Sequence, residues 1–477
     1  MEAIQGVPPA ASVLARMPLA ESAQWLLRWA CDADRLQSIW NLHRSRCYER
    51  LISFGTLVRM IAEALLYHRG SGRRAFEKNI LAERLGASVA AAFGKLGRLP
   101  LAVSQAFLEE TTAALGEVVV PVSLTKPPAS LREFQPLIID GKTIKRVEKR
   151  LKPLRGVGGG LIGGKALVGL DGLTGLALAM EANPDGDSSE NLLVPGLLER
   201  LRRRVPGPRL FIADRSFGNL VQAEQFTTTG DHFLARLHSG CKFTADPARP
   251  AVTSRDETGR TLIDSWGIVG GVSNRRRRAL RQVELQRGPT EETIVVITDL
   301  DDPVKYPAAD LLSAYRDRHG IEMVFHKTTE VFGLHRLIGG SPLAGLFQLA
   351  FCLLLYNIVQ ILLGYVGEAN TLPHEKISAE KLFDDARDQL IAWNILFTPE
   401  QTEEHYRELA DRPSFMRHLR TILKDAWCPT WNKSKPQPNR KVPHTSQSRS
   451  HSSVHRLLEE AAETAPPAKP PPRRPTC

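Results

Sequence analysis

The chain has 477 residues, of which 42% are hydrophobic and 24% are charged, and its formal net charge is +11. This length allows two or three domains with ordinary hydrophobic cores, and it excludes a small domain that needs disulfides or metals to fold. The excess of Lys and Arg favours a polyanionic partner. The six cysteines form no Cys-x-x-Cys pair and the start of the chain lacks a signal-peptide pattern, so we expect a cytoplasmic protein in a reducing compartment.

The first predicted elements are helices, followed by short strands. Residues 10–125 carry helical periodicity almost throughout and predict an all-helical N-terminal domain. From Pro136 onward, four short apolar runs predict strands: PLIIDGK, KALVGLDG, GLALAMEAN and PRLFIAD. Between the third and fourth runs, SSENLLVPGLLERLRRRV predicts an amphipathic helix with Glu190 in its first turn. The resulting order β, β, β, α, β, α, β is that of ribonuclease H-like folds, in which the first and fourth strands lie side by side.

The second half of the chain alternates between strand-like, helical and polar sequence. RRALRQVELQ and TIVVITDL predict a hairpin inside a β-rich insertion, and helical sequence resumes from Ala308 through Tyr315 to Gly333. The apolar run Leu343–Val366 approaches membrane-spanning length, but polar residues interrupt it, so we predict a buried core helix and no membrane partner. From Cys428 onward, the polar, Pro-rich and basic composition predicts a disordered tail.

The fold class predicted is therefore α/β, with a ribonuclease H-like catalytic core that contains a β-rich insertion. An all-helical domain precedes the core and a disordered basic tail follows it. The predicted boundaries are 1–126 for the helical domain, 127–237 for the first part of the core, 238–300 for the insertion, 301–427 for the second part of the core and 428–477 for the tail.

Two aspartates follow apolar strands and carry the first chemical signal. Asp140 ends the run LIID and Asp214 ends the run LFIAD, so both carboxylates are expected at the carboxyl edge of the sheet. On adjacent strands they would converge. Carboxylate oxygens suit Mg²⁺, and a pair of such ions supports in-line displacement at phosphorus. The alternative is that each aspartate only caps its strand before a turn.

A third carboxylate lies in the stretch AYRDRHGIEMVFHK. Tyr315, Arg318 and Glu322 are spaced i, i+3 and i+7, so they would share one face of a helix. A glutamate there supplies a metal ligand, an arginine grips a phosphate with two hydrogen bonds, and a tyrosine hydrogen-bonds or stacks beside it. The alternative is a solvated helix face held by salt bridges.

Four blocks of this sequence resemble a known family: LIIDGK, FIADRSF, VITDLDDPVKYPAADLLSAYRDRHGIE and the apolar helix after Gly340. They are similar to the DDE transposases of bacterial insertion sequences that carry the Tyr-Arg-Glu-Lys signature, of the insertion sequence four family type. The resemblance extends from about Ile138 to Leu362. It implies a ribonuclease H-like fold and a transposase that binds the inverted-repeat ends of its element and performs Mg²⁺-dependent DNA cleavage and strand transfer, that is, cut-and-paste transposition.

The same resemblance implies roles for individual residues. Asp140, Asp214 and Glu322 would be the catalytic residues and would bind two Mg²⁺ ions, with Mn²⁺ as a substitute, while Tyr315 and Arg318 would contact phosphates of the element's end. The partners implied are double-stranded DNA, both as terminal inverted repeats and as target, and a second copy of the chain, because two ends must be brought together. Such a protein is expected in the bacterial cytoplasm at the nucleoid.

The sequence also departs from the family pattern. Ser216 stands where the family usually has glycine, His319 and Gly320 replace tryptophan and glutamine, and Thr329 stands where the signature lysine is expected. Lys327, two residues away, is a candidate for contacting DNA instead. These departures support a second hypothesis: an impaired or retained copy that acts only as a nuclease or as a DNA-binding protein.

Basic clusters and one tryptophan are further candidates for DNA contact. Basic clusters lie just after Asp140, at the end of a predicted helix at residues 202–204 and at the start of a predicted strand at residues 275–278. They would suit contact with a phosphate backbone, although they would also serve solubility. Trp266 would either stack on an unpaired nucleotide or belong to the core. Gly159–Lys165 resembles a phosphate-binding loop, but Ala166 breaks the motif and we interpret the stretch as a flexible turn. The candidates carried forward are Lys142, Arg275, Arg276 and Trp266.

Overall fold

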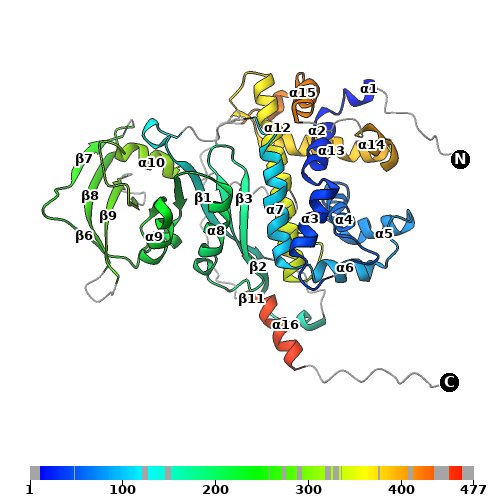
Figure 1. The fold of residues 1–477 in the computed structure, drawn as a ribbon, viewed down its shortest axis with the longest axis horizontal. Coiled ribbons are helices and arrows are strands. Elements are labelled where there is room, and N and C mark those ends of the chain that lie inside the picture. Colours follow the sequence, from blue (N-terminus) through cyan, green and yellow to red (C-terminus); the bar gives the residue numbers. More distant parts are fainter. Residues whose placement is uncertain are drawn as a thin grey trace.

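The chain forms one large mixed sheet with helices packed against it, as the computed structural model shows (Figure 1). The sheet has eleven strands among the described residues. The structure describes residues 11–47, 49–120, 127–145, 152–256, 258–270, 276–286, 293–316, 336–373, 376–406, 412–433 and 451–464, and, between 316 and 336, residues 318, 324, 325, 332 and 334.

The centre of the sheet has the predicted order of elements. They are β1 (Gln135–Lys145), β2 (Gly160–Asp171), β3 (Ala177–Asn183), α8 (Val194–Arg204), β4 (Arg209–Ala213), α9 (Leu220–Phe226) and β5 (His232–Arg236). The first and fourth strands lie side by side as predicted: β1 and β4 are parallel, with Ile139 opposite Ala213. β5 follows β4 in parallel, and β2 and β3 form an antiparallel meander on the other side of β1. This arrangement is consistent with a ribonuclease H-like core.

Alternation of side chains along β1 divides the interior into two hydrophobic cores. Leu137 and Ile139 face the core that contains α8 and α9, whereas Ile138 faces the larger core built around the long helix α12. All five residues of β4 are buried, which explains why this strand reads as a continuous apolar run. The core strands are therefore covered on both faces, and their polar groups gather at the strand ends.

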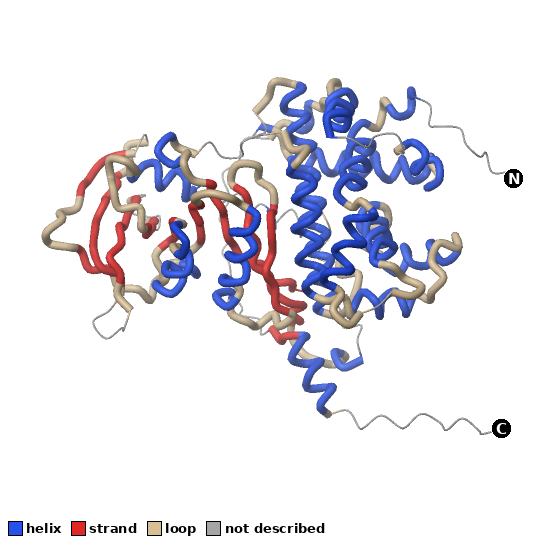
Figure 2. The backbone as a smooth tube through the Cα atoms, viewed as in Figure 1, coloured by secondary structure: helices blue, strands red, loops and turns tan. Residues whose placement is uncertain are grey.

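The β-rich segment continues the same sheet. It comprises β6 (Phe243–Ala245), β7 (Val252–Arg255), β8 (Thr261–Val269), β9 (Arg278–Leu285) and β10 (Ile294–Thr298). The predicted hairpin is found, with Val283 of β9 opposite Val296 of β10. Because β10 also pairs with β5, the segment extends the core sheet edgewise, and no separate domain begins at residue 238 (Figure 2). Helix α10 (Ala308–Arg316) follows and packs against β5, β8 and β9.

The stretch Gly159–Lys165, interpreted from sequence as a flexible turn, forms the start of β2 instead. Gly164 has a φ of +120°, and a side chain there would lie 3.3 Å from Leu346 of α12. The glycines thus let the strand and the helix approach closely. From the sequence alone, glycines needed for such a tertiary contact look the same as glycines of a turn.

Helices from both ends of the chain form the body opposite the β-rich extension (Figure 1). The N-terminal set is α1 (Ala11–Leu14), α2 (Pro18–Ala30), α3 (Ala33–His43), α4 (Phe54–Leu66), α5 (Gly72–Leu81), α6 (Val89–Gly97) and α7 (Leu101–Gly116). The C-terminal set is α12 (Pro342–Ala369), α13 (Ala379–Leu396), α14 (Pro399–His405) and α15 (Arg412–Leu423). The two sets share one hydrophobic core, so the predicted boundary at residue 126 does not separate independent cores.

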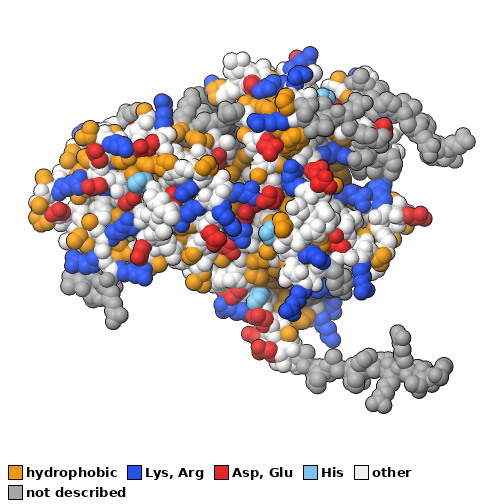
Figure 3. Space-filling model, in the orientation of Figure 1, with side chains coloured by type: hydrophobic (Ala, Val, Ile, Leu, Met, Phe, Trp, Pro, Cys, Tyr) orange, Lys and Arg blue, Asp and Glu red, His pale blue; other side chains and the backbone are white. Residues whose placement is uncertain are grey.

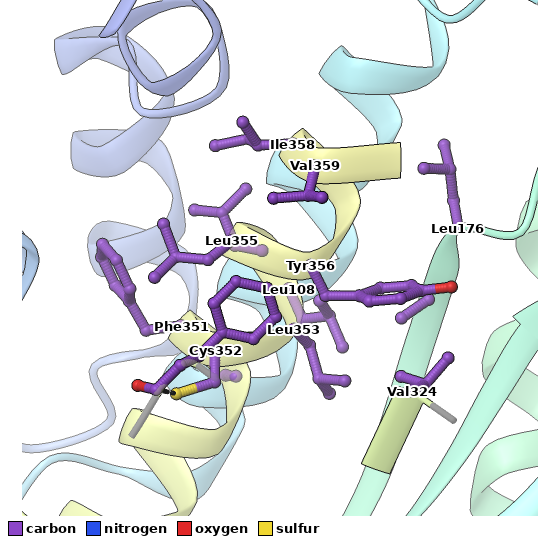
Figure 4. Close-up of a cluster of buried hydrophobic side chains, with 14 of the residues drawn as sticks. Leu108, Leu176, Val324, Phe351, Cys352, Leu353, Leu355, Tyr356, Ile358 and Val359 are labelled. Atoms are coloured by element: carbon purple, nitrogen blue, oxygen red, sulfur yellow. Dashed lines mark hydrogen bonds between the residues drawn. The ribbon is translucent and has the colours of Figure 1, made fainter. Parts of the chain in front are cut away.

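Helix α12 is the centre of that core, as predicted. Among the described helices it is the one long and apolar enough to cross a membrane, and its apolar window is wholly buried within the protein. Figure 4 shows Phe351 and Tyr356 of this helix among side chains from other elements, including Leu108 of α7 and Leu176. Asn357, one of the interrupting polar residues, bonds both the N–H and the C=O of Ala177 on β3, at 2.8 and 3.0 Å.

The expectation of a disordered tail from Cys428 onward is wrong for residues 428–433 and 451–464. Trp431 is buried and its indole N–H donates to Asp385 Oδ2 at 2.6 Å. β11 (His451–Ser453) pairs in parallel with β2, and α16 (Val454–Glu463) follows with Val454 buried. The overall polar composition concealed a short amphipathic helix and a strand whose pairing is non-local.

Candidate active site

Asp140 and Asp214 occupy adjacent positions on the two parallel core strands. Asp140 follows Ile139 on β1, and Asp214 follows Ala213 at the end of β4. Ile139 and Ala213 lie opposite each other in the pairing of the two strands. By strand alternation, both aspartates share the face of Ile138 and Ile212, which belong to the core around α12. The predicted convergence of the two carboxylates is therefore found.

Asp214 also organises the turn that follows it. Its carboxylate accepts from the backbone N–H of Ser216 at 2.8 Å and so caps the short helix η4 (Arg215–Phe217). Phe217 is buried beneath the turn, and a side chain at Gly218 would lie 1.8 Å from the carbonyl oxygen of Arg236. The glycine thus allows this turn to dock directly on the end of β5. One oxygen of Asp214 caps the turn, which is the alternative role considered from sequence, but this does not use up the carboxylate's remaining acceptor capacity.

A carboxylate that sequence reasoning had assigned only to a helix start lies at the same place. Glu190 begins the short helix η3 (Glu190–Leu192), and a side chain at Gly141 would lie 2.3 Å from the Cδ of Glu190. Glu190 therefore rests directly against the backbone that follows Asp140. The signal in the sequence was the glycine after the aspartate, because a glycine within a strand often marks a close approach.

The surrounding carboxylates affect the protonation of Asp140 and Glu190. Burial, together with the negative charges of Asp214 and Glu190, raises the pKa of Asp140 to about 6, against the lowering effects of the Gly141 N–H at 2.8 Å and of Arg318. Burial also raises the pKa of Glu190, which Asp214 raises further and Lys165 lowers. The site thus concentrates negative charge in a partly buried place, where a divalent cation would relieve the repulsion.

Tyr315 and Arg318 lie beside these carboxylates. The Arg318 guanidinium lies 3.7 Å from Asp140 Oδ2, and its side chain is only 12% exposed. Tyr315 is buried on α10, and burial raises its pKa. The prediction of one helical face through Tyr315, Arg318 and Glu322 is not confirmed, because α10 ends at Arg316. Arg318 lies in a turn, in which its backbone N–H donates to the carbonyl oxygen of Tyr315 at 3.1 Å.

Arg236 is a cation at the site that the sequence did not single out. Ala235 of β5 is opposite Ala213 of β4, so the next residues, Arg236 and Asp214, lie at neighbouring positions at the same edge. The positive charge of Arg236 also acts on Tyr315, lowering its pKa against the effect of burial. Only the register of β4 and β5 reveals this placement.

Glu322 lies outside the described residues, as do Lys327, Arg275, His319, Gly320 and Thr329. The described residues on either side of it contact the β1 edge. Arg318 approaches Asp140, and the ammonium of Lys142 lies 5.7 Å from the ring centroid of Phe325, which is buried. Within the described part of the chain, no group of three His, Cys, Asp or Glu side chains is arranged to hold a metal ion.

Several basic residues proposed for DNA contact are engaged within the protein. Arg202 pairs with Asp231 at 2.8 Å, and Arg204 pairs with Glu110. Arg276 is exposed and lies 3.4 Å from Glu224, so it remains on the surface. Over the face seen in Figure 3, basic and acidic side chains are interspersed, which locates no single DNA-binding surface there.

Trp266 belongs to the core of the extension, the second of the two alternatives considered from the sequence, and is not a candidate for stacking on a nucleotide. Its ring is buried, its indole N–H donates to Asp301 O at 3.0 Å, and the guanidinium of Arg249 lies 4.1 Å from the ring centroid. The ring is therefore covered by the protein's own arginine.

Residues 132–358 match the family described as "Transposase DDE domain". The match supports a DDE transposase. No curated protein matches the chain. The DDE domain match begins just before β1 and ends within α12, so it includes Asp140, Asp214 and the sequence position of Glu322. The family implies a nucleic-acid-cleaving enzyme with a DNA substrate, of a kind that uses divalent metal ions.

Proposed function

We propose that the protein is the transposase of an insertion sequence of the Tyr-Arg-Glu-Lys type, which binds the inverted-repeat ends of its element and catalyses Mg²⁺-dependent cleavage and strand transfer. The observation that carries this proposal is the pair formed by Asp140 and Asp214. They lie on one face of adjacent parallel strands inside the DDE domain match, and Arg318 lies 3.7 Å from Asp140.

The donor set fits a hard divalent cation. Asp140 and Asp214 offer carboxylate oxygens, and a bound cation would offset both the burial and the repulsion by Asp214 that raise the pKa of Asp140. We propose Glu322 as the third ligand, because the residues that flank it at 318 and 325 contact Asp140 and Lys142. Two Mg²⁺ ions, or Mn²⁺ in their place, would supply Lewis-acid stabilisation of the charge that develops around phosphorus.

The cations of the site are suited to the phosphate groups of DNA. Arg318 lies 3.7 Å from Asp140, and its guanidinium carries the parallel N–H donors that bind a phosphate. Tyr315 packs beside it and limits its movement. Arg236 adds a third group at the end of β5. These residues would orient the scissile phosphodiester over the carboxylates.

The proposed reaction has two displacement steps at phosphorus. Water attacks the phosphodiester at the element's end, the P–O3′ bond breaks, and the products are a 3′-hydroxyl and a 5′-phosphate. The 3′-hydroxyl then attacks a phosphodiester of the target, forming one P–O bond as another breaks. We further propose that a dimer holds the two ends together and that the protein acts on DNA in the bacterial cytoplasm.

The proposal is tested with a duplex that carries the repeats flanking the protein's own gene. Incubation with Mg²⁺ should produce a nick at the repeat boundary and, with a target plasmid, joined products; EDTA should abolish both. Nicking without joining would support the hypothesis of a nuclease-only copy. Binding to the repeat without any nicking in Mg²⁺ or Mn²⁺ would overturn the catalytic proposal.

A further inference from the structure

A second basic site lies in the helical body, built from residues distant in sequence. Arg69 and Arg73, from the loop and first turn of α5, face the same cavity as Arg336, which precedes α12. The cavity has a volume of about 630 Å³, and Phe93 and Leu337 form part of its wall. We call this site the arginine pocket. No acidic residue lines it among the described residues.

Glycines bring the two segments of the arginine pocket together. A side chain at Gly70 would lie 3.1 Å from Cβ of Arg336, and one at Gly72 would lie 2.2 Å from Cγ2 of Ile338. Arg69 has a φ of +50°, a left-handed conformation that costs a non-glycine residue free energy. The Arg336 guanidinium donates to Arg69 O at 3.2 Å, which fixes the spacing of the two arginines.

The charge around the arginine pocket is strongly positive. The first turn of α5 contains no acidic residue and carries Arg73 and Arg74 at the end where the helix dipole is already positive. Glu77 pairs with Arg73 at 2.7 Å, but this pair is exposed and compensates little. The pKa of the neighbouring His68 is lowered by burial and by Lys78 and Arg74, which agrees with a cationic surrounding. Like charges held together in this way are stabilised by an anionic ligand.

Phosphate groups suit the positive charge of the arginine pocket, and a DNA backbone carries enough of them to occupy all three arginines. A guanidinium binds phosphate with two parallel hydrogen bonds, and three guanidinium groups exceed what one phosphate needs. A run of consecutive phosphates along one strand would use them all. Arg336 also follows Glu322 by fourteen residues in the sequence, so the arginine pocket is joined by a short segment to the chain that carries the proposed third ligand.

We propose that the arginine pocket binds backbone phosphates of the DNA substrate away from the cleavage site. This inference rests on the proposed function and adds to it a contact that fixes the duplex on the helical body. Binding there would be insensitive to base sequence, because phosphates carry none of the sequence information directly.

The test uses the full chain with Arg69→Gln and Arg336→Gln combined, and Arg387→Gln with Arg420→Gln as the matched control. The control arginines are also partly exposed, and each pairs with a carboxylate on the C-terminal helices. Anisotropy of a labelled duplex is measured over a salt series. The double variant should bind at least about tenfold more weakly, and its slope of log K against log salt should fall by about 0.9 per lost contact, whereas the control should keep the slope.

Each other outcome has a defined meaning. An unchanged slope in a variant with a normal thermal melt overturns the inference. If the double variant unfolds, Arg73→Gln, which removes an exposed side chain, should lower the slope by itself, and an unchanged slope again overturns the inference. Binding of ATP that is weakened by these variants while duplex binding is unaffected would reassign the pocket to a free nucleotide and overturn the DNA assignment.

Nicking by the wild-type protein, measured in parallel, separates this inference from the proposed function. If the wild type nicks DNA normally with Mg²⁺ and the double variant keeps the wild-type salt slope, only the inference about the arginine pocket is overturned. A reduced slope in a protein whose wild type never nicks DNA supports the pocket as a DNA contact while overturning the catalytic proposal.

Discussion

Two regions of one sheet hold carboxylates in opposite ways. In the extension, Asp264 on β8 accepts two hydrogen bonds from Arg281 on β9, at 2.8 and 2.6 Å, and the Arg281 side chain is 0% exposed. The same guanidinium donates to the carbonyl of Tyr306 at 2.7 Å. At the core edge, Asp140 has Arg318 only at 3.7 Å and lies beside two further carboxylates, Asp214 and Glu190.

Under the proposed function, the difference separates carboxylates that serve folding from carboxylates that would bind a ligand. A buried carboxylate that is fully paired within the chain contributes to one arrangement of the strands and leaves nothing for a substrate. A group of partly buried carboxylates that is less fully paired within the chain is unfavourable unless something else binds there. Mutations at the core edge should therefore change nicking, and mutations in the extension should change the free energy of unfolding.

The largest effect is expected from Asp140→Asn and Asp214→Asn. Under the proposed function each removes a charge that would hold the cation, so Mg²⁺-dependent nicking should fall by several orders of magnitude, and the losses should not add because both would serve one unit. The melting temperature should hold or rise for Asp140→Asn, since a raised pKa means that the ionised form is disfavoured in the fold. Asp187→Asn, at an exposed position nearby, is the control and should cut normally. Normal nicking by Asp214→Asn would remove it from the active site.

The extension should respond through stability alone. Arg281→Met leaves Asp264 buried without its partner, and we expect a loss of about 3–5 kcal/mol in the free energy of unfolding. Asp264→Leu added to Arg281→Met should recover much of that loss, because no unpaired charge then remains. Denaturant titrations measure both. A severe loss of nicking in Arg281→Met at a temperature where it is fully folded would contradict this division between the two regions.

Glu190→Gln tests whether the third carboxylate belongs to the charged site. Its side chain lies against Gly141, so loss of its charge should weaken cation binding and reduce nicking by about 10- to 100-fold, less than loss of Asp140. The Mg²⁺ concentration for half-maximal nicking should rise in parallel. Glu199→Gln is the matched control, since Glu199 lies on the following helix α8 and is exposed beside Arg203. Equal behaviour of the two variants would make Glu190 a structural residue.

The sequence predicted those features that depend on local pattern. Strand-like runs and the rule that parallel neighbours share an edge were enough to bring Asp140 and Asp214 together, and a long apolar run interrupted by a few polar residues identified α12 as a buried core helix. The features missed depend on register or on distant contacts. Glu190 approaches β1 only because Gly141 has no side chain, and Arg236 reaches the site only through the pairing of β4 with β5. The pairing of β11 with β2 joins residues almost three hundred positions apart, which no window of sequence reveals.

The smallest effect is expected where the core and the extension meet. His232, at the start of β5, bonds Asp299, just after β10, at 2.8 Å, and this hydrogen bond together with the nearby carboxylates raises the pKa of His232, against the lowering effect of burial. A raised pKa in the folded state means that the stabilisation is fully present below the unfolded value of about 6.5 and is lost as pH rises through the folded value.

Unfolding free energy should therefore fall by up to about 1 kcal/mol between pH 6 and 8.5, a modest figure because the imidazole is about one-third exposed. His232→Asn removes the titrating group, so the difference in stability between wild type and this variant should shrink over the same interval. The difference in stability between wild type and Asp299→Asn should shrink over the same pH interval as well, since the ion pair needs both charges. Denaturant titrations at several pH values give these differences directly. A difference that stays constant with pH would show that the junction between the two regions is held by packing, with Phe134 against the imidazole, and not by charge.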